Sequence, residues 1–209
     1  MGLGSLSRNQ TFLWLLLVFA TGVSCVHPPF PRQLLLQHFP TAFVIVVLPL
    51  LVRRYPVTDG TFACVVAFML LHVLGARYIY SYVPYDEWSE RLFGVSLARL
   101  PGLRRNHYDR LVHFAFGLLA PRPFREVQTR YLNVPDGVSR YFAIEFVMAF
   151  SMLYELFEWG LTMVLSPGDA GAYNGEQGDI WDAHKDMSFA AIGAIGWYLL
   201  SRFRRPVSR

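Results

Sequence analysis

The chain has 209 residues, of which 54% are hydrophobic and only 16% carry a charge. A soluble domain of this size normally contains more charged residues, and here the apolar residues fall in long blocks separated by short polar loops. The net charge of +4 does not indicate nucleic-acid binding, because almost all basic residues are arginines at the ends of these blocks. Composition therefore favours a helical membrane domain over a soluble domain, with no nucleic acid as a partner.

Six apolar blocks along the chain have the length expected of membrane-spanning helices. We predict an all-α transmembrane bundle in which residues 1–209 form one integral membrane domain. The predicted spans are residues 11–26, 35–52, 60–83, 107–120, 142–165 and 187–202. The fourth and sixth are short, and we expect amphipathic extensions at their N-terminal ends to complete them. We also expect the first block to be an uncleaved span, because its apolar run is long for a signal peptide.

The arginines predict the orientation of this bundle. With the N-terminus in the cytoplasm, the cytoplasmic side would carry eleven arginines and the outer side six basic residues. The eleven are Arg8, Arg53, Arg54, Arg122, Arg125, Arg130, Arg140, Arg202, Arg204, Arg205 and Arg209, and the six are Arg32, Arg91, Arg99, Arg104, Arg105 and Lys185. Because cytoplasmic loops are enriched in basic residues, we expect both termini in the cytoplasm. In the longest outer loop, residues 84–106, we expect an amphipathic helix at the membrane surface.

A run of three aspartates stands immediately before the last predicted span. Asp179, Asp182 and Asp186 are spaced i, i+3 and i+7, so a helix would place all three carboxylates on one face. Carboxylates close to hydrocarbon are costly unless a partner neutralises them. The run therefore predicts a partner, either cationic side chains or a bound metal ion.

Three other predicted spans bring ionisable residues to the same outer half of the membrane. The third contains His72, the fourth contains Asp109 and His113 four residues apart, and the fifth contains Glu155 and Glu158 three residues apart. Together with the aspartate run, these residues predict a water-accessible polar cavity that opens outward. Intramembrane ionisable residues usually mark a functional site.

So many carboxylates cannot all be ionised at close quarters without a cation. We predict a site for Mg²⁺, Mn²⁺, Zn²⁺ or Fe²⁺, with Asp109 behind the direct ligands and with His72 and His107 as acid or base near neutral pH. The candidate ligands are His113, Glu155, Glu158, Asp179, Asp182 and Asp186.

Each of these residues also has a purely structural interpretation. His72 could hydrogen-bond another helix, and Asp109 could pair with an arginine such as Arg110. Glu155 could share a proton with Glu158, and Asp179 could cap the last helix. Taken singly, these interpretations are favoured; taken together, the polar residues favour a functional cavity.

The segments that carry these residues resemble the YjdF-like family of bacterial inner-membrane proteins. The resemblance is strongest in residues 72–78, 105–114, 154–159 and 178–182, and it extends over most of the chain from about residue 40. It implies a multi-pass protein of the bacterial inner membrane. It implies no activity.

Three functions remain open from the sequence. The first is a metal-dependent enzyme acting on a lipid or a lipid-linked phosphate at the outer leaflet, with a metal that activates water or clamps phosphate. The second is a cation- or proton-coupled transporter, although the sequence shows no internal repeat. The third is a structural or assembly protein in which the polar residues lock helices together. We place the enzyme first, with the lipid bilayer and a lipid or phosphorylated substrate as partners.

Overall fold

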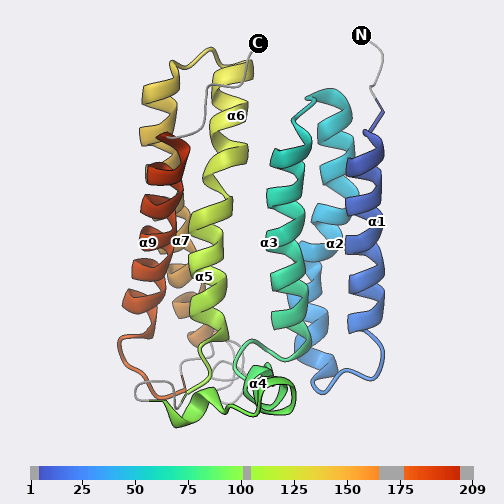
Figure 1. The fold of residues 1–209 in the computed structure, drawn as a ribbon, viewed down its shortest axis with the longest axis vertical. Coiled ribbons are helices and arrows are strands. Elements are labelled where there is room, and N and C mark those ends of the chain that lie inside the picture. The colour runs from blue at the N-terminus through green and yellow to red at the C-terminus, as the bar shows by residue number, and fades with distance from the viewer. Residues whose placement is uncertain (1–4, 101–104, 165–176, 203–209) are drawn as a thin grey trace.

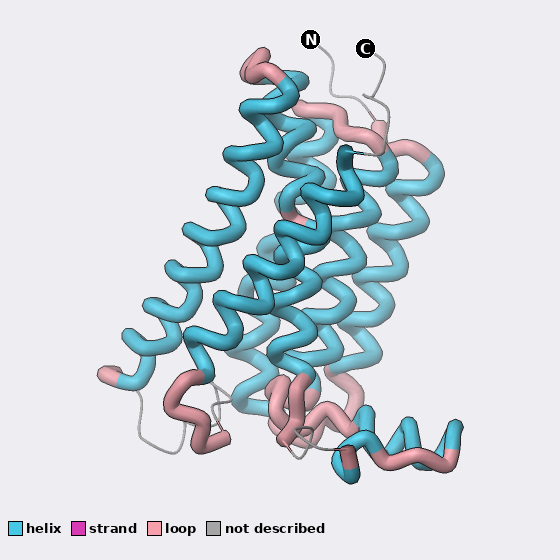
Figure 2. The backbone as a smooth tube through the Cα atoms, turned by 60° about the vertical axis from the view of Figure 1, so that its left-hand side comes forward, coloured by secondary structure: helices cyan, strands magenta, loops and turns pink. Residues whose placement is uncertain are grey.

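The computed structural model describes residues 5–100, 105–164 and 177–202, and within these ranges every regular element is a helix (Figure 2). This confirms the all-α prediction. The elements in chain order are α1 (Arg8–Ser24), α2 (Pro31–Arg54), α3 (Asp59–Arg77), α4 (Tyr85–Phe93), the 3₁₀ turn η1 (Leu97–Arg99), α5 (Tyr108–Leu119), α6 (Pro121–Tyr131), α7 (Asp136–Thr162) and α9 (Asp182–Arg202).

The long helices form two groups that stand side by side (Figure 1). In the N-terminal group, α1 and α2 pack against α3. In the C-terminal group, α5 and α7 pack against α9, and α6 packs against α7. The two groups meet where α3 contacts α5 and α6. Helix α3 therefore lies at the centre of the N-terminal group and also forms the surface of that group that contacts the C-terminal group.

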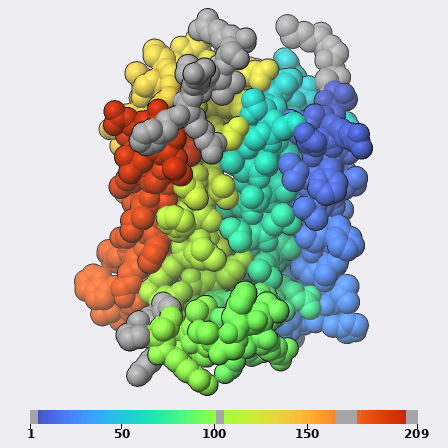
Figure 3. Space-filling model, in the orientation of Figure 1, coloured from blue at the N-terminus to red at the C-terminus, as the bar shows by residue number. Residues whose placement is uncertain are grey.

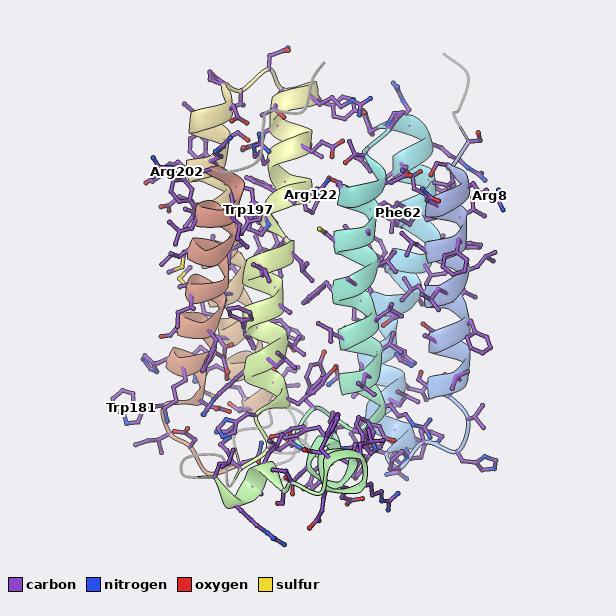
Figure 4. The ribbon with its side chains drawn as sticks, in the orientation of Figure 1. Arg8, Phe62, Arg122, Trp181, Trp197 and Arg202 are labelled. Atoms are coloured by element: carbon purple, nitrogen blue, oxygen red, sulfur yellow. The ribbon has the colours of Figure 1, made fainter. Side chains whose placement is uncertain are left out.

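The two ends of the bundle differ in their side chains. Arg8, Arg122 and Arg202 lie towards one end, which we call the arginine-rich end, whereas Trp181 lies near the other (Figure 4). Helix α4 and the turn η1 lie across that other end, which we call the α4 end (Figure 3). The prediction from the arginines assigns the arginine-rich end to the cytoplasm.

Helices occur at all six predicted spans, but within the described part of the chain only α2 and α3 are long and apolar enough to cross a membrane by length and composition. The count of six spans and their orientation stay predictions. The expected N-terminal extension of the sixth span is present, because α9 begins at Asp182. The expectation for the fourth was wrong: α5 begins at Tyr108, and α6 instead continues the path at its C-terminal end. Pro121 explains the break between them, because proline has no N–H to donate to the preceding turn.

The third span was also predicted too long, because α3 ends at Arg77 and not at residue 83. The chain turns back at Ile79 and Tyr80, which have φ values of 42° and 55°. The N–H of Tyr80 donates to the carbonyl oxygen of Gly75, and the Tyr80 ring lies so close to Gly75 that a Cβ there would be 2.7 Å from Cε1. The aromatic residues of this turn have the hydropathy of a span, which is why composition could not locate the helix end.

A core of apolar side chains fills the N-terminal group, and a polar contact attaches it to the C-terminal group. The core consists of Leu17, Val52, Phe62, Val66, Met69 and Val73. On α6, the Glu126 carboxylate accepts hydrogen bonds from the Thr58 N–H and hydroxyl, both at 2.7 Å, and from the Thr61 hydroxyl. Since Thr58 caps the N-terminus of α3, this contact fixes α6 against the start of α3.

Candidate metal centre

Three helices of the C-terminal group carry the ionisable side chains that the sequence singled out. Helix α5 contributes Asp109 and His113, α7 contributes Glu155 and Glu158, and α9 contributes Asp186. We call these five residues the carboxylate cluster. All five are buried, with exposed fractions between 3% for Asp186 and 9% for Glu158. The predicted outward-facing cavity is therefore not open to water at these side chains.

A close contact between α5 and α9 brings two members of the cluster to the same level. A Cβ on Gly117 would lie 2.0 Å from the carbonyl oxygen of Ala190, and a Cβ on Gly193 would lie 2.2 Å from that of Phe114. Only glycine permits this approach, as expected for small residues at a membrane-helix contact. Gly117 lies one turn after His113, and Ala190 one turn after Asp186, so the contact also brings these two side chains together.

The cluster has the spacing of ligands around one ion. A ligand atom from each of Asp109, His113 and Asp186 lies within 4.8 Å of the other two. The His113 Nε2 atom lies 3.8 Å from Asp109 Oδ1 and 3.5 Å from Glu155 Oε1. Two ligands of one tetrahedral ion, each at about 2.1 Å, would lie roughly 3.4 Å apart. Asp109, which we expected behind the direct ligands, thus belongs to the group itself.

Two carboxylate oxygens in the cluster have no hydrogen-bond partner among the residues that the structure describes. They are Glu155 Oε1 and Asp186 Oδ1, and both are fully buried. Buried polar atoms are nearly always hydrogen-bonded, and an unsatisfied one costs free energy. Glu158 is buried beside them, close enough to Asp109, Glu155 and Asp186 for mutual electrostatic repulsion, and it hydrogen-bonds Tyr154. The cluster therefore contains carboxylate oxygens that could bind a cation and that the described side chains do not hydrogen-bond.

Asp179 and Asp182, the other two residues of the aspartate run, have arginine partners. Asp182 lies 2.8 Å from Arg105 and 3.0 Å from Arg110. Asp179 lies 3.2 Å from Arg105 and 2.6 Å from both Arg110 and Lys185. The hydrogen bond from Lys185 holds the pKa of Asp179 well below its usual range. The run thus has one of the two predicted kinds of partner, because Asp179 and Asp182 pair with cationic side chains. Asp186 instead belongs to the carboxylate cluster, and a metal ion as its partner stays a prediction.

The two histidines predicted as acid or base lie outside the cluster. His72 Nε2 is 3.0 Å from the carbonyl oxygen of Gln37 on α2, so this nitrogen carries the proton, and its Nδ1 contacts the Tyr80 hydroxyl. Both ring nitrogens thus have partners, one on helix α2 and the other in the turn after α3, and the bond to α2 matches the structural interpretation left open above. His107 precedes α5, and its Nδ1 lies 3.1 Å from an Arg110 nitrogen at the edge of the ion-pair network.

The cluster ends at an apolar layer on the side of the arginine-rich end. The buried residues of this layer are Val147, Ala190 and Ala194, against which Phe116, Ala120, Ile144 and Phe146 pack. The ion pairs of Asp179 and Asp182 lie on the side of the α4 end, because both residues precede Asp186 by a turn or more. An apolar cavity of about 320 Å³ between α3 and α6, lined by Phe68, Phe116 and Phe124 among others, lies apart from the carboxylates.

Comparison with known proteins agrees with the membrane character of the sequence. A family model described as a predicted membrane protein (DUF2238) matches residues 9–206. The inner membrane protein YjdF of Escherichia coli (strain K12) is 32% identical over 200 residues, which cover 95% of this chain and 90% of the relative. No solved structure matches.

Proposed function

The chain belongs to the DUF2238 family of predicted membrane proteins, and we propose that its carboxylate cluster is the divalent metal centre of an enzyme. Its location is the bacterial inner membrane. The proposed ligands are Asp109, His113 and Asp186, with Glu155 and Glu158 close enough to complete the coordination. The proposed substrate is a lipid or a lipid-linked phosphate.

The observation that carries this proposal is the pair of unsatisfied carboxylate oxygens beside the imidazole of His113. A buried anion without a hydrogen bond costs several kcal/mol unless it is neutralised. Arg110 is the cation closest to Asp186, but the two atoms are 3.9 Å apart and the guanidinium already bonds Asp179 and Asp182. An ion in the cluster would satisfy both free oxygens at once.

The donor set indicates which metals fit and what they would do. Several carboxylate oxygens with one imidazole suit Mn²⁺, Zn²⁺ or Fe²⁺, and Mg²⁺ would take the carboxylates with retained water. When bound, such an ion lowers the pKa of a coordinated water or polarises a phosphoryl oxygen. Glu155 and Glu158, buried beside the proposed ligands, are positioned to accept or hold a proton during hydrolysis.

Two features of the bundle favour an enzyme over a transporter. The apolar layer around Val147 and Ala190 separates the cluster from the arginine-rich end, so a coupled transporter would have to open this layer in its other state. Many transporters consist of two inverted repeats related by a two-fold axis. If the two helix groups were such repeats, α1 would correspond to α5 and α3 to α9. The contact of α3 with α5 would then be matched by a contact of α9 with α1. The main contacts between the groups, as far as the chain is described, are those of α3 with α5 and α6.

The test is the metal content of the full-length protein purified in detergent after growth with Mn²⁺, Zn²⁺, Fe²⁺ and Mg²⁺. We expect about one ion per chain in the wild type, measured by mass spectrometry of the elements, and at least a tenfold loss in His113→Ala and Asp186→Asn. His184→Ala is the matched control, because His184 is an exposed histidine on the same helix as Asp186. Wild-type protein without stoichiometric metal would overturn the proposal and leave protons as the neutralising partner.

A further inference from the structure

One carboxylate oxygen atom at the α4 end lies in contact with three cationic side chains. Asp179 Oδ2 lies 3.2 Å from Arg105 Nη1, 2.6 Å from Arg110 Nη2 and 2.6 Å from Lys185 Nζ. The two guanidinium groups come from α5 and the segment before it, and the ammonium group comes from α9. A single carboxylate oxygen rarely needs three cations, whereas each oxygen of a phosphate group commonly has several donors.

Asp182 and Asp179 share the two arginines but differ in how firmly they are held. Asp182 lies on α9 and its side chain is only 6% exposed, so it is a fixed partner that orients both guanidinium groups. Asp179 lies before the helix and its side chain is 18% exposed. It is therefore the partner that another anion can replace.

The backbone before Asp179 is in an unfavourable conformation. Gln177 has a φ of 49°, which is uncommon for a residue with a side chain, and Gly178 has a φ of 79°. The Gln177 side chain accepts a hydrogen bond from the Asn106 N–H and donates one to the Asn106 carbonyl oxygen. The turn before Asp179 is therefore anchored by a contact that does not involve the carboxylate.

We propose that Arg105, Arg110 and Lys185 form a binding site for a phosphate monoester group, and that the Asp179 carboxylate occupies this site when no ligand is bound. The proposal deepens the proposed function by naming the group of the substrate that the protein holds. Only the reaction of the bound phosphate group rests on the proposed function. The three cations bind phosphate with or without a metal ion in the cluster.

The charges match a phosphate dianion. Arg105, Arg110 and Lys185 contribute three positive charges, and Asp182 stays in place with one negative charge, so these four side chains have a net charge of +2 (3 − 1). Asp186 lies farther off, at 3.9 Å from Arg110 Nε. A phosphate monoester carries a charge between about −1.5 and −2 at pH 7. Guanidinium groups bind phosphate through two parallel N–H donors. Arg105 presents Nη1 to Asp179 and Nη2 to Asp182, whereas Arg110 presents Nη2 to both carboxylates.

The test compares phosphate binding by full-length variants purified in detergent and freed of metal with a chelator. In Asp179→Asn the competing charge is gone, while the amide oxygen still accepts the hydrogen bond that Trp181 N–H makes with Asp179 Oδ1. We expect this variant to bind inorganic phosphate roughly tenfold more tightly than the wild type in calorimetry. Lys185→Gln, made in the Asp179→Asn background, should weaken binding by a similar factor. Lys185 is half-exposed, so its substitution should not prevent folding.

Glu87→Gln is the matched control, because it also removes one carboxylate at the α4 end, from a side chain that is 69% exposed, but leaves the three cations unchanged. A second arm places the wild type and Asp179→Asn in bilayer discs with phosphatidic acid or with phosphatidylcholine alone. Competition by phosphatidic acid against inorganic phosphate would assign the site to a lipid headgroup, and its absence would assign the site to a free phosphate compound. The proposal is overturned if Asp179→Asn binds phosphate no better than Glu87→Gln, or if Lys185→Gln leaves its affinity unchanged. Metal content, measured separately, tests the proposed function.

Discussion

The two helix groups have similar helical frameworks but differ in what fills them. The core of the N-terminal group consists of apolar side chains from α1, α2 and α3. In the C-terminal group, the buried stripe of α7 begins with Ser139 and Ala143 and ends in Glu155 and Glu158. An apolar core is stable by packing alone, whereas buried carboxylates need protons or a cation. We infer from this difference that the C-terminal group carries the proposed metal site and that the N-terminal group supports it.

The contact between the groups is consistent with this division. Helix α3 of the N-terminal group packs on α5, which carries His113, and on α6, where Glu126 binds Thr58 and Thr61. Tyr108, at the start of α5, donates a hydrogen bond to the carbonyl oxygen of Leu71 on α3. The N-terminal group therefore positions α5 without contributing a ligand to the cluster.

The largest effect on stability is expected from the core of the N-terminal group. Phe62 is completely buried there, and Phe62→Ala should lower the free energy of unfolding by about 3–5 kcal/mol, because a cavity replaces its packing contacts. Denaturant titration in detergent measures this change. The metal content of the protein that remains folded should not change. Phe12→Ala is the control, since Phe12 is 65% exposed on α1 and should cost far less. Loss of metal from folded Phe62→Ala would contradict the inference that the two groups have separate roles.

A smaller loss of stability, with a larger effect on the site, is expected at the contact between α5 and α9. Gly193→Ala places a methyl group against the backbone of α5, and forced separation of the helices should cost about 1–3 kcal/mol. Because the same contact brings His113 to Asp186, metal binding should weaken as well. Gly160→Ala is the matched control: Gly160 lies on α7 of the same group, and a Cβ there would meet no atom within 4 Å. Equal metal content in both variants would show that the close contact does not build the site.

Sequence periodicity and composition predicted much of this fold, because membrane helices can be recognised in a sequence as long apolar segments. The helix positions and the short helix within residues 84–106 followed from patterns within single segments. The end of α3 did not, because Ile79 and Tyr80 turn back in response to a contact with Gly75 that hydropathy does not record. Pro121 is a clear signal in the sequence for the break between α5 and α6. That the fourth span is extended at its C-terminal end, by α6, depended on the packing of α6 against α7.

For the site, helical spacing correctly grouped residues within one helix but could not assign partners between helices. Asp109 and His113 stack on α5 as expected. The spacing of Asp179, Asp182 and Asp186 suggested one shared ligand face, yet Asp179 lies before the start of α9 and meets arginines there. Arg105 and Arg110 precede this aspartate run by about 70 residues, and only the tertiary fold reveals that they meet it.

The smallest effect concerns the linker that joins the groups at the α4 end. Asp86 accepts hydrogen bonds from the Ala98 N–H at 2.9 Å and from the Ser96 hydroxyl at 3.0 Å, which ties α4 to η1. The bond from Ala98 lowers the pKa of Asp86 below its ordinary value. A lowered pKa in the folded state means that this carboxylate stabilises the linker fully above the ordinary aspartate pKa near 4, and that the contribution is lost as the pH falls through the lowered pKa.

Acid should therefore loosen the linker while both helix groups stay folded. We expect protease cleavage between α4 and η1 by pepsin to increase a fewfold from pH 5 to pH 2.5, without a change in helical circular dichroism. At pH 5, Asp86→Asn should already be cleaved faster than the wild type, because its uncharged amide accepts the two hydrogen bonds more weakly. Glu87→Gln is the matched control: Glu87 is the next residue along α4, and its carboxylate, 69% exposed, makes only a long surface ion pair with Arg91. If Asp86→Asn and Glu87→Gln are cleaved at the same rate at pH 5, Asp86 does not hold the linker, and another contact joins the two groups at this end.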